Sequence, residues 1–285
     1  MSTEKPLIII LDVDGTLIGD IRQQVIVYEL HQAIKQVNKK FNLMNMKELQ
    51  YKLRAGGIIR PYFQRFVRKI KETYTNVEFF IYTASEKNWA NFLIPQIEKA
   101  TGIKFNRPIF TREQCTFDVS GGFRKHMKIV LPMIVKSLKK KYHTLTLDAL
   151  ENRVMMIDNH KNVFDDHDQR LVLSCPTYDY KFAENIPAML TPKSFDAYKN
   201  IVLQTLSSHV ASISSSTNFL VFQHIFYTFY VSLLSNLHQY NHKQLEDRFF
   251  AKLANLMHLK KFEAFSPKVI NYLFVKTNFS MKNTP

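Results

Sequence analysis

Residues 6–20 read PLIIILDVDGTLIGD, in which five aliphatic residues run directly into two aspartates that are one residue apart. An uninterrupted aliphatic run of this length is typical of a strand that is buried on both faces of a sheet. Alternate residues of an extended segment point to the same side, so Asp12 and Asp14 can reach one pocket where Gly15 lets the chain turn. The pattern predicts an acidic site at the carboxyl end of a buried strand.

Other short apolar runs in the first two-thirds of the chain have the same form. They are Val77 to Tyr82, Val154 to Ile157, Leu171 to Leu173 and a weaker run at Ile109 and Phe110. Helical patterns separate these runs, which predicts an α/β fold with a Rossmann-like, doubly wound parallel sheet. Ligands of such sheets bind beyond the carboxyl ends of the strands. The residues that close the runs are therefore the candidate site: Asp12, Thr83, Asp158 and Asn159.

The remaining patterns predict how the chain divides. Residues 17–59 are rich in Lys, Gln and Asn and place apolar residues every three to four positions, which predicts a small helical insertion. Strand patterns stop near residue 185, so we expect a core over residues 1–190 and a helical C-terminal extension over residues 191–285. Within the extension, Phe219 to Leu234 is apolar nearly all round but shorter than the roughly 20 residues of a membrane span, which favours a buried or subunit-interface helix.

Composition narrows the class of partner and the compartment. The 285 residues include 39 Lys and Arg against 24 Asp and Glu, a formal net charge of +15, which favours an anionic partner such as a phosphorylated protein, nucleic acid or a membrane surface. Cys115 and Cys175 are too few for a disulfide framework, and neither has the Cys-x5-Arg spacing of a thiol phosphatase. The N-terminus lacks the pattern of a signal peptide, so we expect an intracellular protein of the cytoplasm or nucleus.

Two carboxylates in one pocket have a specific chemical use. Their repulsion is relieved by a divalent cation, and Mg²⁺ suits a site built of carboxylates and a phosphate. One carboxylate can then attack phosphorus to form an aspartyl phosphate while the other transfers protons. A strand-end threonine such as Thr83 and a lysine can stabilise the phosphoryl oxygens, although Thr83 can equally cap the helix that begins near Ser85.

The motifs LDVDGTL, IYTAS and MMIDN together resemble those of the haloacid dehalogenase superfamily of aspartate-based phosphatases. The segments RPYFQRFV, FTREQC and GGFRKHMK are similar to the branch called NLI-interacting-factor-like or RNA polymerase II carboxy-terminal-domain phosphatases. The resemblance spans roughly residues 5–205. The richness in Lys, Asn, Ile and Phe is typical of an AT-rich genome, and large DNA viruses carry proteins that resemble this family.

The resemblance implies a catalytic role for four matched residues. Asp12 would be the nucleophile and Asp14 the general acid and base. Thr83 would hold a phosphoryl oxygen, and Lys125 would neutralise the phosphate, with Lys128 as an alternative to Lys125.

It also implies ligands for the substrate and for Mg²⁺. Ala84 would bind the substrate together with Thr83 and Lys125. The metal would be held by Asp12, by Asp14 through its backbone carbonyl, and by Asp158 with Asn159. The acidic residues Asp165, Asp166 and Asp168 are expected to form a solvated loop.

We therefore expect a Mg²⁺-dependent phosphatase that acts on phosphoserine or phosphothreonine in proteins. One alternative is a phosphatase of nucleic acids or small molecules, since the same motifs and positive charge serve such substrates. A second alternative is an assembly protein that keeps the fold and makes contacts, including contacts with copies of itself, through its C-terminal helices. Nucleic acid is a less favoured partner than protein, and a membrane less favoured still.

Overall fold

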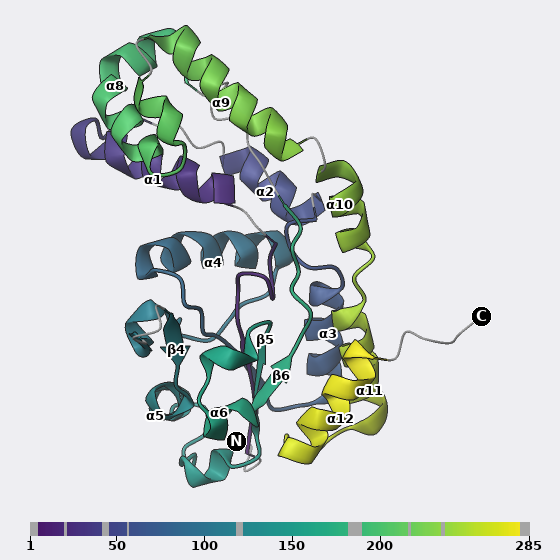
Figure 1. The fold of residues 1–285 in the computed structure, drawn as a ribbon. Helices are drawn as coiled ribbons and strands as arrows, with labels where there is room; N and C mark the ends of the chain where they lie inside the picture. The colour runs from purple at the N-terminus through teal and green to yellow at the C-terminus, as the bar shows by residue number, and fades with distance from the viewer. Residues whose placement is uncertain are drawn as a thin grey trace. The chain divides into compact units, whose positions relative to one another are not determined.

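The computed structural model describes residues 5–19, 22–41, 46–55, 57–117, 122–181, 190–215, 218–234 and 237–279. The chain divides into two compact units (Figure 1). The first unit consists of Met1–Ile18, Ile59–Tyr178 and Glu246–Pro285, and the second of Gly19–Ile58 and Asp179–Leu245. This division differs from the expected boundary near residue 190, because residues 246–285 group with the sheet rather than with the helices that precede them.

A four-stranded parallel sheet with the strand order β2-β1-β5-β6 forms the centre of the first unit. Its strands are β1 (Leu7–Leu11), β2 (Val77–Ile81), β5 (Val154–Asp158) and β6 (Val172–Ser174). Every residue of β1, β2 and β5 is buried, as their largely apolar sequences predict, and the buried residues include Glu78 of β2 and Asp158 of β5. Ile9 of β1 is in register with Phe79 on one side and Met155 on the other. The α/β fold class is confirmed.

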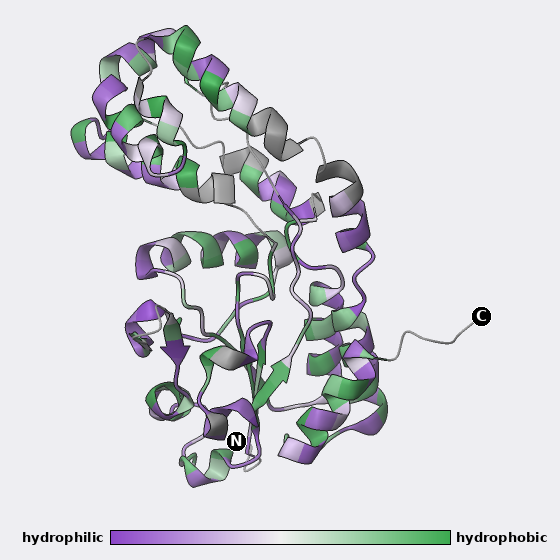
Figure 2. Ribbon diagram, in the orientation of Figure 1, coloured by the Kyte–Doolittle hydropathy of each residue, from purple (hydrophilic) through white to green (hydrophobic). Residues whose placement is uncertain are grey.

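Helices cover both faces of this sheet, because successive strand residues point to opposite sides. On one face, Ile8, Ile10 and Phe80 share a buried cluster with residues of α5 (Met127–Leu138). On the other face, the ring of Phe79 lies 6.2 Å from that of Phe66 on α3 (Phe63–Thr73). Phe66 in turn lies 5.1 Å from Phe250 on α11 (Phe249–Lys260). Figure 1 shows α3 and α11 side by side, and Figure 2 shows β6 as a hydrophobic strand.

The remaining elements of the first unit connect and extend these layers. They are α4 (Lys87–Thr101), β3 (Cys115–Phe117), β4 (Phe123–Lys125), α6 (Asp166–Gln169), α12 (Pro267–Asn278) and the short 3₁₀ helices η1 (Arg112–Gln114), η2 (Asp148–Leu150) and η3 (Lys161–Val163). β3 and β4 pair antiparallel as a hairpin that leads directly into α5. α12 begins where Ser266 Oγ accepts a hydrogen bond from Val269 N and Pro267 occupies the first turn.

The regular elements among the described residues of the second unit are all helices. Its elements are α1 (Arg22–Val37), α2 (Met46–Ala55), α8 (Pro192–Ser207), η4 (Ala211–Ser215), α9 (Phe219–Leu234) and α10 (Leu237–Leu245). Phe195 of α8 stacks on Phe222 of α9 with the ring centroids 4.8 Å apart. Among the residues that the structure describes, no helix has both the length and the apolar character that a membrane crossing requires. The helical C-terminal region is therefore confirmed, although it contributes to both units.

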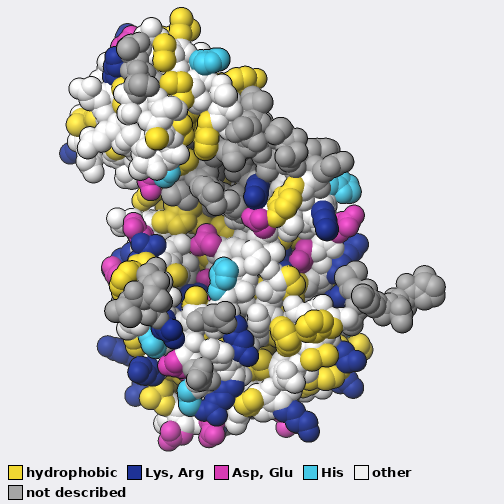
Figure 3. All heavy atoms as spheres, in the orientation of Figure 1, with side chains coloured by type: hydrophobic (Ala, Val, Ile, Leu, Met, Phe, Trp, Pro, Cys, Tyr) yellow, Lys and Arg dark blue, Asp and Glu magenta, His cyan; other side chains and the backbone are white. Residues whose placement is uncertain are grey.

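The surface charge of the first unit is dispersed on the face drawn in Figure 3. Among the residues coloured there, Lys and Arg side chains are spread over several parts of the surface, and Asp and Glu side chains lie among them. The net positive charge of the chain is not gathered into one patch on that face.

Candidate active site

Three of the predicted residues meet at the carboxyl edge of the sheet. Asp12 follows β1, Asp158 ends β5, and Lys125 ends β4. Nζ of Lys125 lies 2.6 Å from Oδ1 of Asp12 and 2.7 Å from Oδ2 of Asp158. All three residues are buried, with 2% of the surface of Lys125 and 1% of that of Asp158 exposed. One ammonium group thus links the ends of two neighbouring strands.

The electrostatics of this cluster favour a charged lysine, and the cluster as a whole has an excess of negative charge. Burial by itself would lower the pKa of Lys125, but the carboxylates of Asp12 and Asp158 outweigh burial and raise it. The pKa of Asp158 is raised to about 6, because burial and the nearby charge of Asp12 together outweigh the opposing effect of Lys125. When ionised, the carboxylates of the site carry more negative charge than one ammonium balances.

Asp14 lies on the side of the site that is open to solvent. Its Oδ2 accepts a hydrogen bond of 2.7 Å from Ser85 Oγ and a longer one of 3.4 Å from Thr83 Oγ1. Desolvation by the surrounding protein raises the pKa of Asp14, and the nearby charge of Asp12 adds to the rise. Because Asp14 also has an exposed surface, water screens this rise in part. The Asp14 carboxyl is therefore suited to exchanging a proton with a bound group.

The segment after β2 supplies hydroxyl groups to the site. Thr83 is buried, and its Oγ1 accepts a hydrogen bond of 3.1 Å from Ser85 N, so this side chain both caps the following turn and faces Asp14. The Ala84 carbonyl accepts a bond of 2.9 Å from Arg112 Nε. The sequence prediction assigned Ser85 no role in the site. The one feature of the sequence that indicates a role for Ser85 is its position in the motif IYTAS, two residues after Thr83.

The turn after Asp14 fixes Asn159. Thr16 Oγ1 donates to Asn159 Oδ1 at 3.0 Å and accepts from Asn159 N at 2.9 Å. Asn159 Nδ2 donates to Thr177 Oγ1 at 3.2 Å. Gly15 has φ of 74°, and a Cβ there would lie 2.6 Å from Asn159 Nδ2. Both the conformation and the close approach require glycine. The contact of Thr16 with Asn159 was not predicted from the sequence.

The structure distinguishes between the two candidate lysines. Lys125 is buried between the carboxylates, whereas Lys128 is exposed on α5. The difference follows from their places in the hairpin and helix, because Lys125 ends β4 on the side that faces Asp12. Lys125 is therefore the lysine that belongs to the site.

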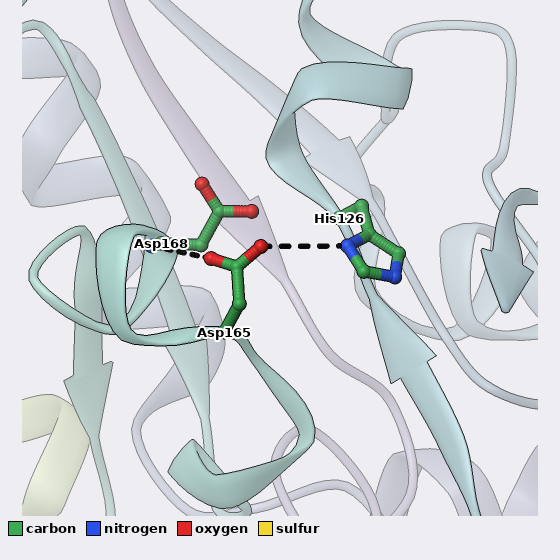
Figure 4. Close-up of side chains that lie close together, drawn as sticks. All are labelled: His126, Asp165 and Asp168. Atoms are coloured by element: carbon green, nitrogen blue, oxygen red, sulfur yellow. Dashed lines mark hydrogen bonds and ion pairs between the residues drawn. The ribbon is translucent and has the colours of Figure 1, made fainter. Parts of the chain in front are cut away.

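A second group of titratable side chains consists of His126, Asp165 and Asp168, which lie close together (Figure 4). His126 directly follows Lys125 in the sequence. Asp165 Oδ1 accepts from Asp168 N at 2.9 Å and caps α6, and Asp168 Oδ2 accepts from Met127 N at 2.7 Å at the start of α5. His126 Nδ1 lies 3.6 Å from Asp165 Oδ2. The expectation that Asp168 lies in a solvated loop is wrong. Asp168 is buried, because its carboxylate accepts a hydrogen bond from the first turn of α5. These contacts fix the backbone next to Lys125.

A parallel α/β sheet whose carboxyl edge carries clustered acids and a buried ammonium is suited to phosphoryl transfer through an aspartate. The chain belongs to the NLI interacting factor-like phosphatase family, whose family model matches residues 7–191. It is a phosphatase of the haloacid dehalogenase type. The resemblance inferred from the motifs is confirmed.

The solved structures that match this chain include two that are described as RNA polymerase II CTD phosphatases. One is Fcp1, described as an essential RNA polymerase II CTD phosphatase, at 18% identity and a TM-score of 0.35, covering 82% of this chain and 67% of that chain. The other is a variant of the fission yeast RNA polymerase II CTD phosphatase Fcp1 bound to beryllium fluoride, at 14% identity, a TM-score of 0.35 and the same coverage. Comparison with curated protein sequences finds no match.

Proposed function

We propose that the protein is a Mg²⁺-dependent protein phosphatase that removes phosphate from serine or threonine through an aspartyl-phosphate intermediate. The observation that carries the proposal is the buried contact of Lys125 with both Asp12 and Asp158 at the carboxyl edge of the sheet. This contact holds the carboxylate of Asp12 at the end of β1, with the Asp14 carboxyl beside it. A fixed carboxylate next to a proton donor is the arrangement that covalent phosphoryl transfer needs.

Two displacement steps follow from these positions. An oxygen of Asp12 attacks phosphorus, the bond from phosphorus to the serine or threonine oxygen breaks, and Asp14 donates its proton to that leaving oxygen. Water then attacks the phosphorus of the aspartyl phosphate, and Asp14 takes a proton from the water. The bond between phosphorus and the Asp12 oxygen breaks, which restores the Asp12 carboxylate and releases inorganic phosphate. The Lys125 ammonium and the Thr83 hydroxyl stabilise the charge on the phosphoryl oxygens. The raised pKa of Asp14 favours its role as proton donor.

The donor set fits a magnesium ion. The carboxylates of Asp12, Asp14 and Asp158 outnumber the single ammonium of Lys125, and oxygen atoms of this kind are the ligands that Mg²⁺ prefers. Asp12, Asp158, Asn159 and the backbone carbonyl of Asp14 would hold the ion. The oxygen of Asn159 that accepts from Thr16 has a second lone pair for a metal. When bound, the ion supplies positive charge that balances the carboxylates and the phosphate.

A phosphorylated protein is the substrate that suits the open side of the site. Asp14, the proposed proton donor, is exposed, so a phosphorylated side chain on a larger molecule can reach it. The net charge of +15 favours an acidic, multiply phosphorylated partner. Contacts between copies of the chain through the C-terminal helices are a separate proposal, which light scattering of the purified protein tests.

The test of this chemistry is hydrolysis of an aryl phosphate with and without Mg²⁺. Asp12→Asn should lower kcat by at least about 10³-fold, because the covalent step then has no attacking carboxylate. Asp196→Asn, which changes an exposed acid on α8, is the matched control and should keep the wild-type rate. Turnover that survives in Asp12→Asn, or that does not depend on Mg²⁺, would contradict the proposal.

The substrate class is tested by comparing three phosphate esters at equal concentration. We expect kcat/KM to be highest for a phosphoserine peptide, lower for a 3′-phosphorylated oligonucleotide and lower still for a nucleoside monophosphate. A preference for the oligonucleotide or the nucleotide would assign the protein to the alternative phosphatase class. A biological effect that is kept in Asp12→Asn would favour an assembly role.

A further inference from the structure

A buried ion pair connects the segment before α11 to the core of the first unit. Arg60 precedes α3 and its side chain is fully buried, with 0% exposed. Its Nε and Nη2 donate to the two carboxylate oxygens of Asp247 at 3.0 and 2.8 Å. Asp247 is 187 residues away in sequence and lies outside the 7–191 segment that the family model matches. A two-point contact of this kind fixes the orientation of a guanidinium as well as its charge.

Asp247 is itself held in place at the start of α11. Its Oδ1 also accepts a hydrogen bond of 2.9 Å from Phe249 N. The ring of Phe249 lies under the guanidinium, with 4.8 Å between the ring centroid and Cζ of Arg60. Arg60 is therefore positioned by one rigid helix start rather than by a flexible surface side chain.

The remaining nitrogen of Arg60 reaches the turn that carries the catalytic acids. Nη1 donates to the backbone oxygen of Thr16 at 3.3 Å and to Cys175 Sγ at 3.2 Å. Cys175 is buried, and its Sγ is a second acceptor for the same nitrogen of Arg60. The backbone nitrogen of Arg60 also donates to Leu17 O at 2.9 Å. Arg60 thus holds the turn at two successive residues.

The same turn orients the proposed magnesium ligand. Thr16 is fully buried, and its Oγ1 exchanges two hydrogen bonds with Asn159, at 3.0 and 2.9 Å. A continuous series of contacts therefore runs from Asp247 through Arg60 and Thr16 to Asn159. Groups that orient a metal ligand from behind influence metal affinity strongly, because they set the direction of its oxygen.

We propose that Asp247 is a positioning residue of the active site: through Arg60 it fixes the Gly15–Leu17 turn and so the orientation of Asn159 toward Mg²⁺. This inference rests on the proposed function, since it takes Asn159 as a metal ligand. Removing the charge of Asp247 leaves the Arg60 guanidinium buried without its carboxylate, and the guanidinium must then move toward water or toward another oxygen. Either movement releases the Thr16 carbonyl, and the Thr16–Asn159 pair shifts with it.

The experiment compares Asp247→Asn, Asp247→Glu and Leu253→Ala in the full chain. Asn keeps the shape of Asp247 and removes its charge, while Glu keeps the charge. Leu253 is a fully buried residue of α11 that is not part of the contact series, so Leu253→Ala is the control for lost packing. Three quantities are measured for each protein: the dissociation constant of Mg²⁺ by calorimetry, kcat and KM for an aryl phosphate, and the melting temperature.

We expect Asp247→Asn to weaken Mg²⁺ binding and to lower kcat by about 10-fold each, with KM nearly unchanged. Asp247→Glu should recover most of both values. Leu253→Ala should lower the melting temperature at least as much as Asp247→Asn while Mg²⁺ affinity and kcat stay within about twofold of wild type.

Two results would overturn the inference while leaving the proposed function intact. One is wild-type Mg²⁺ affinity and kcat in Asp247→Asn. The other is a loss in Leu253→Ala that equals the loss in Asp247→Asn, which would assign the effect to stability alone. A wild-type protein that binds no Mg²⁺, or full turnover in Asp12→Asn, would instead overturn the proposed function and this inference together.

Discussion

Gly15 and Gly102 have nearly the same backbone conformation, with φ of 74° and 71°, but their surroundings differ. A Cβ on Gly15 would lie 2.6 Å from Asn159 Nδ2, whereas nothing lies within 4 Å of a Cβ on Gly102, which ends α4. The two positions therefore separate the cost of a left-handed backbone from the cost of displacing Asn159. The cost of the left-handed backbone applies to both glycines, whereas the cost of displacing Asn159 applies to Gly15 alone.

Both Gly15→Ala and Gly102→Ala should lose about 1–2 kcal/mol of stability, because alanine disfavours positive φ. Gly15→Ala should in addition weaken Mg²⁺ binding and lower kcat by about 10-fold or more, since the new methyl group pushes Asn159 from its place. Denaturant unfolding measures the first effect, and calorimetry with aryl phosphate kinetics measures the second. Equal activity in the two variants would show that the contact of Gly15 with Asn159 does not matter for the site.

The helix α9 has one buried side and one exposed side, although both sides are apolar. The sequence FLVFQHIFYTFYVSLL is apolar nearly all round, yet Phe222 and Phe226 are fully buried while Leu220 is 73% exposed. Phe222 lies 4.8 Å from Phe195 and 5.9 Å from Phe226, so the buried side is a stack of aromatic rings. Ring packing within the second unit, rather than apolar character alone, fixes which side of α9 is buried.

Phe222→Ala should lower the stability of the second unit by about 3–5 kcal/mol, because a ring is removed from a packed stack. Leu220→Ala, a change on the exposed side of the same helix, should alter stability by less than about 0.5 kcal/mol. Circular dichroism during denaturant unfolding measures the loss of helix in both variants and in the wild type. A large loss in Leu220→Ala would indicate that the exposed side of α9 is covered in solution, for example by a second copy of the chain.

The stability of the first unit depends on the C-terminal residues 246–285. Residues 246–285 belong to the first unit, and α11 contributes Phe250, Leu253 and Met257 to the core with none of their surface exposed. Burial of each such side chain stabilises a fold by about 1.5–3 kcal/mol. A folded domain is stable by only about 5–15 kcal/mol in total. The C-terminal helices α11 and α12 are therefore part of the first unit and its core, although they lie outside the segment that the family model matches.

In a chain that ends at residue 245, the first unit should unfold and the protein should aggregate. The hydrophobic surface that α11 covers in the full chain is then exposed, and Arg60 is left buried without Asp247. A chain that ends at residue 279 keeps both helices and should fold and turn over substrate as the full chain does. Fluorescence of the single tryptophan, Trp89 on α4, reports the state of the first unit, and size-exclusion chromatography reports aggregation. An active, monodisperse chain ending at residue 245 would contradict this view.

Local patterns determined the sheet and the position of the acids. The aliphatic run coincides with β1 (Leu7–Leu11), and the run at Val154 continues one residue further to include Asp158 in β5. Strands that are buried on both faces are mostly apolar in sequence, and the carboxyl edge of a parallel sheet is where their polar end residues meet. For that reason Asp12, Asp158 and the Thr83 segment could be predicted from the sequence alone.

Only the tertiary structure decided which distant residues complete the site and the core. The choice of Lys125 over Lys128, the use of Ser85 and the pairing of Arg60 with Asp247 depend on contacts between segments far apart in the chain. Periodicity describes neighbours in sequence, whereas an ion pair between residues 187 positions apart is set by how helices pack on the sheet. The sequence therefore predicted a candidate site at the carboxyl edge of the sheet, and packing determined which distant residues lie beside it.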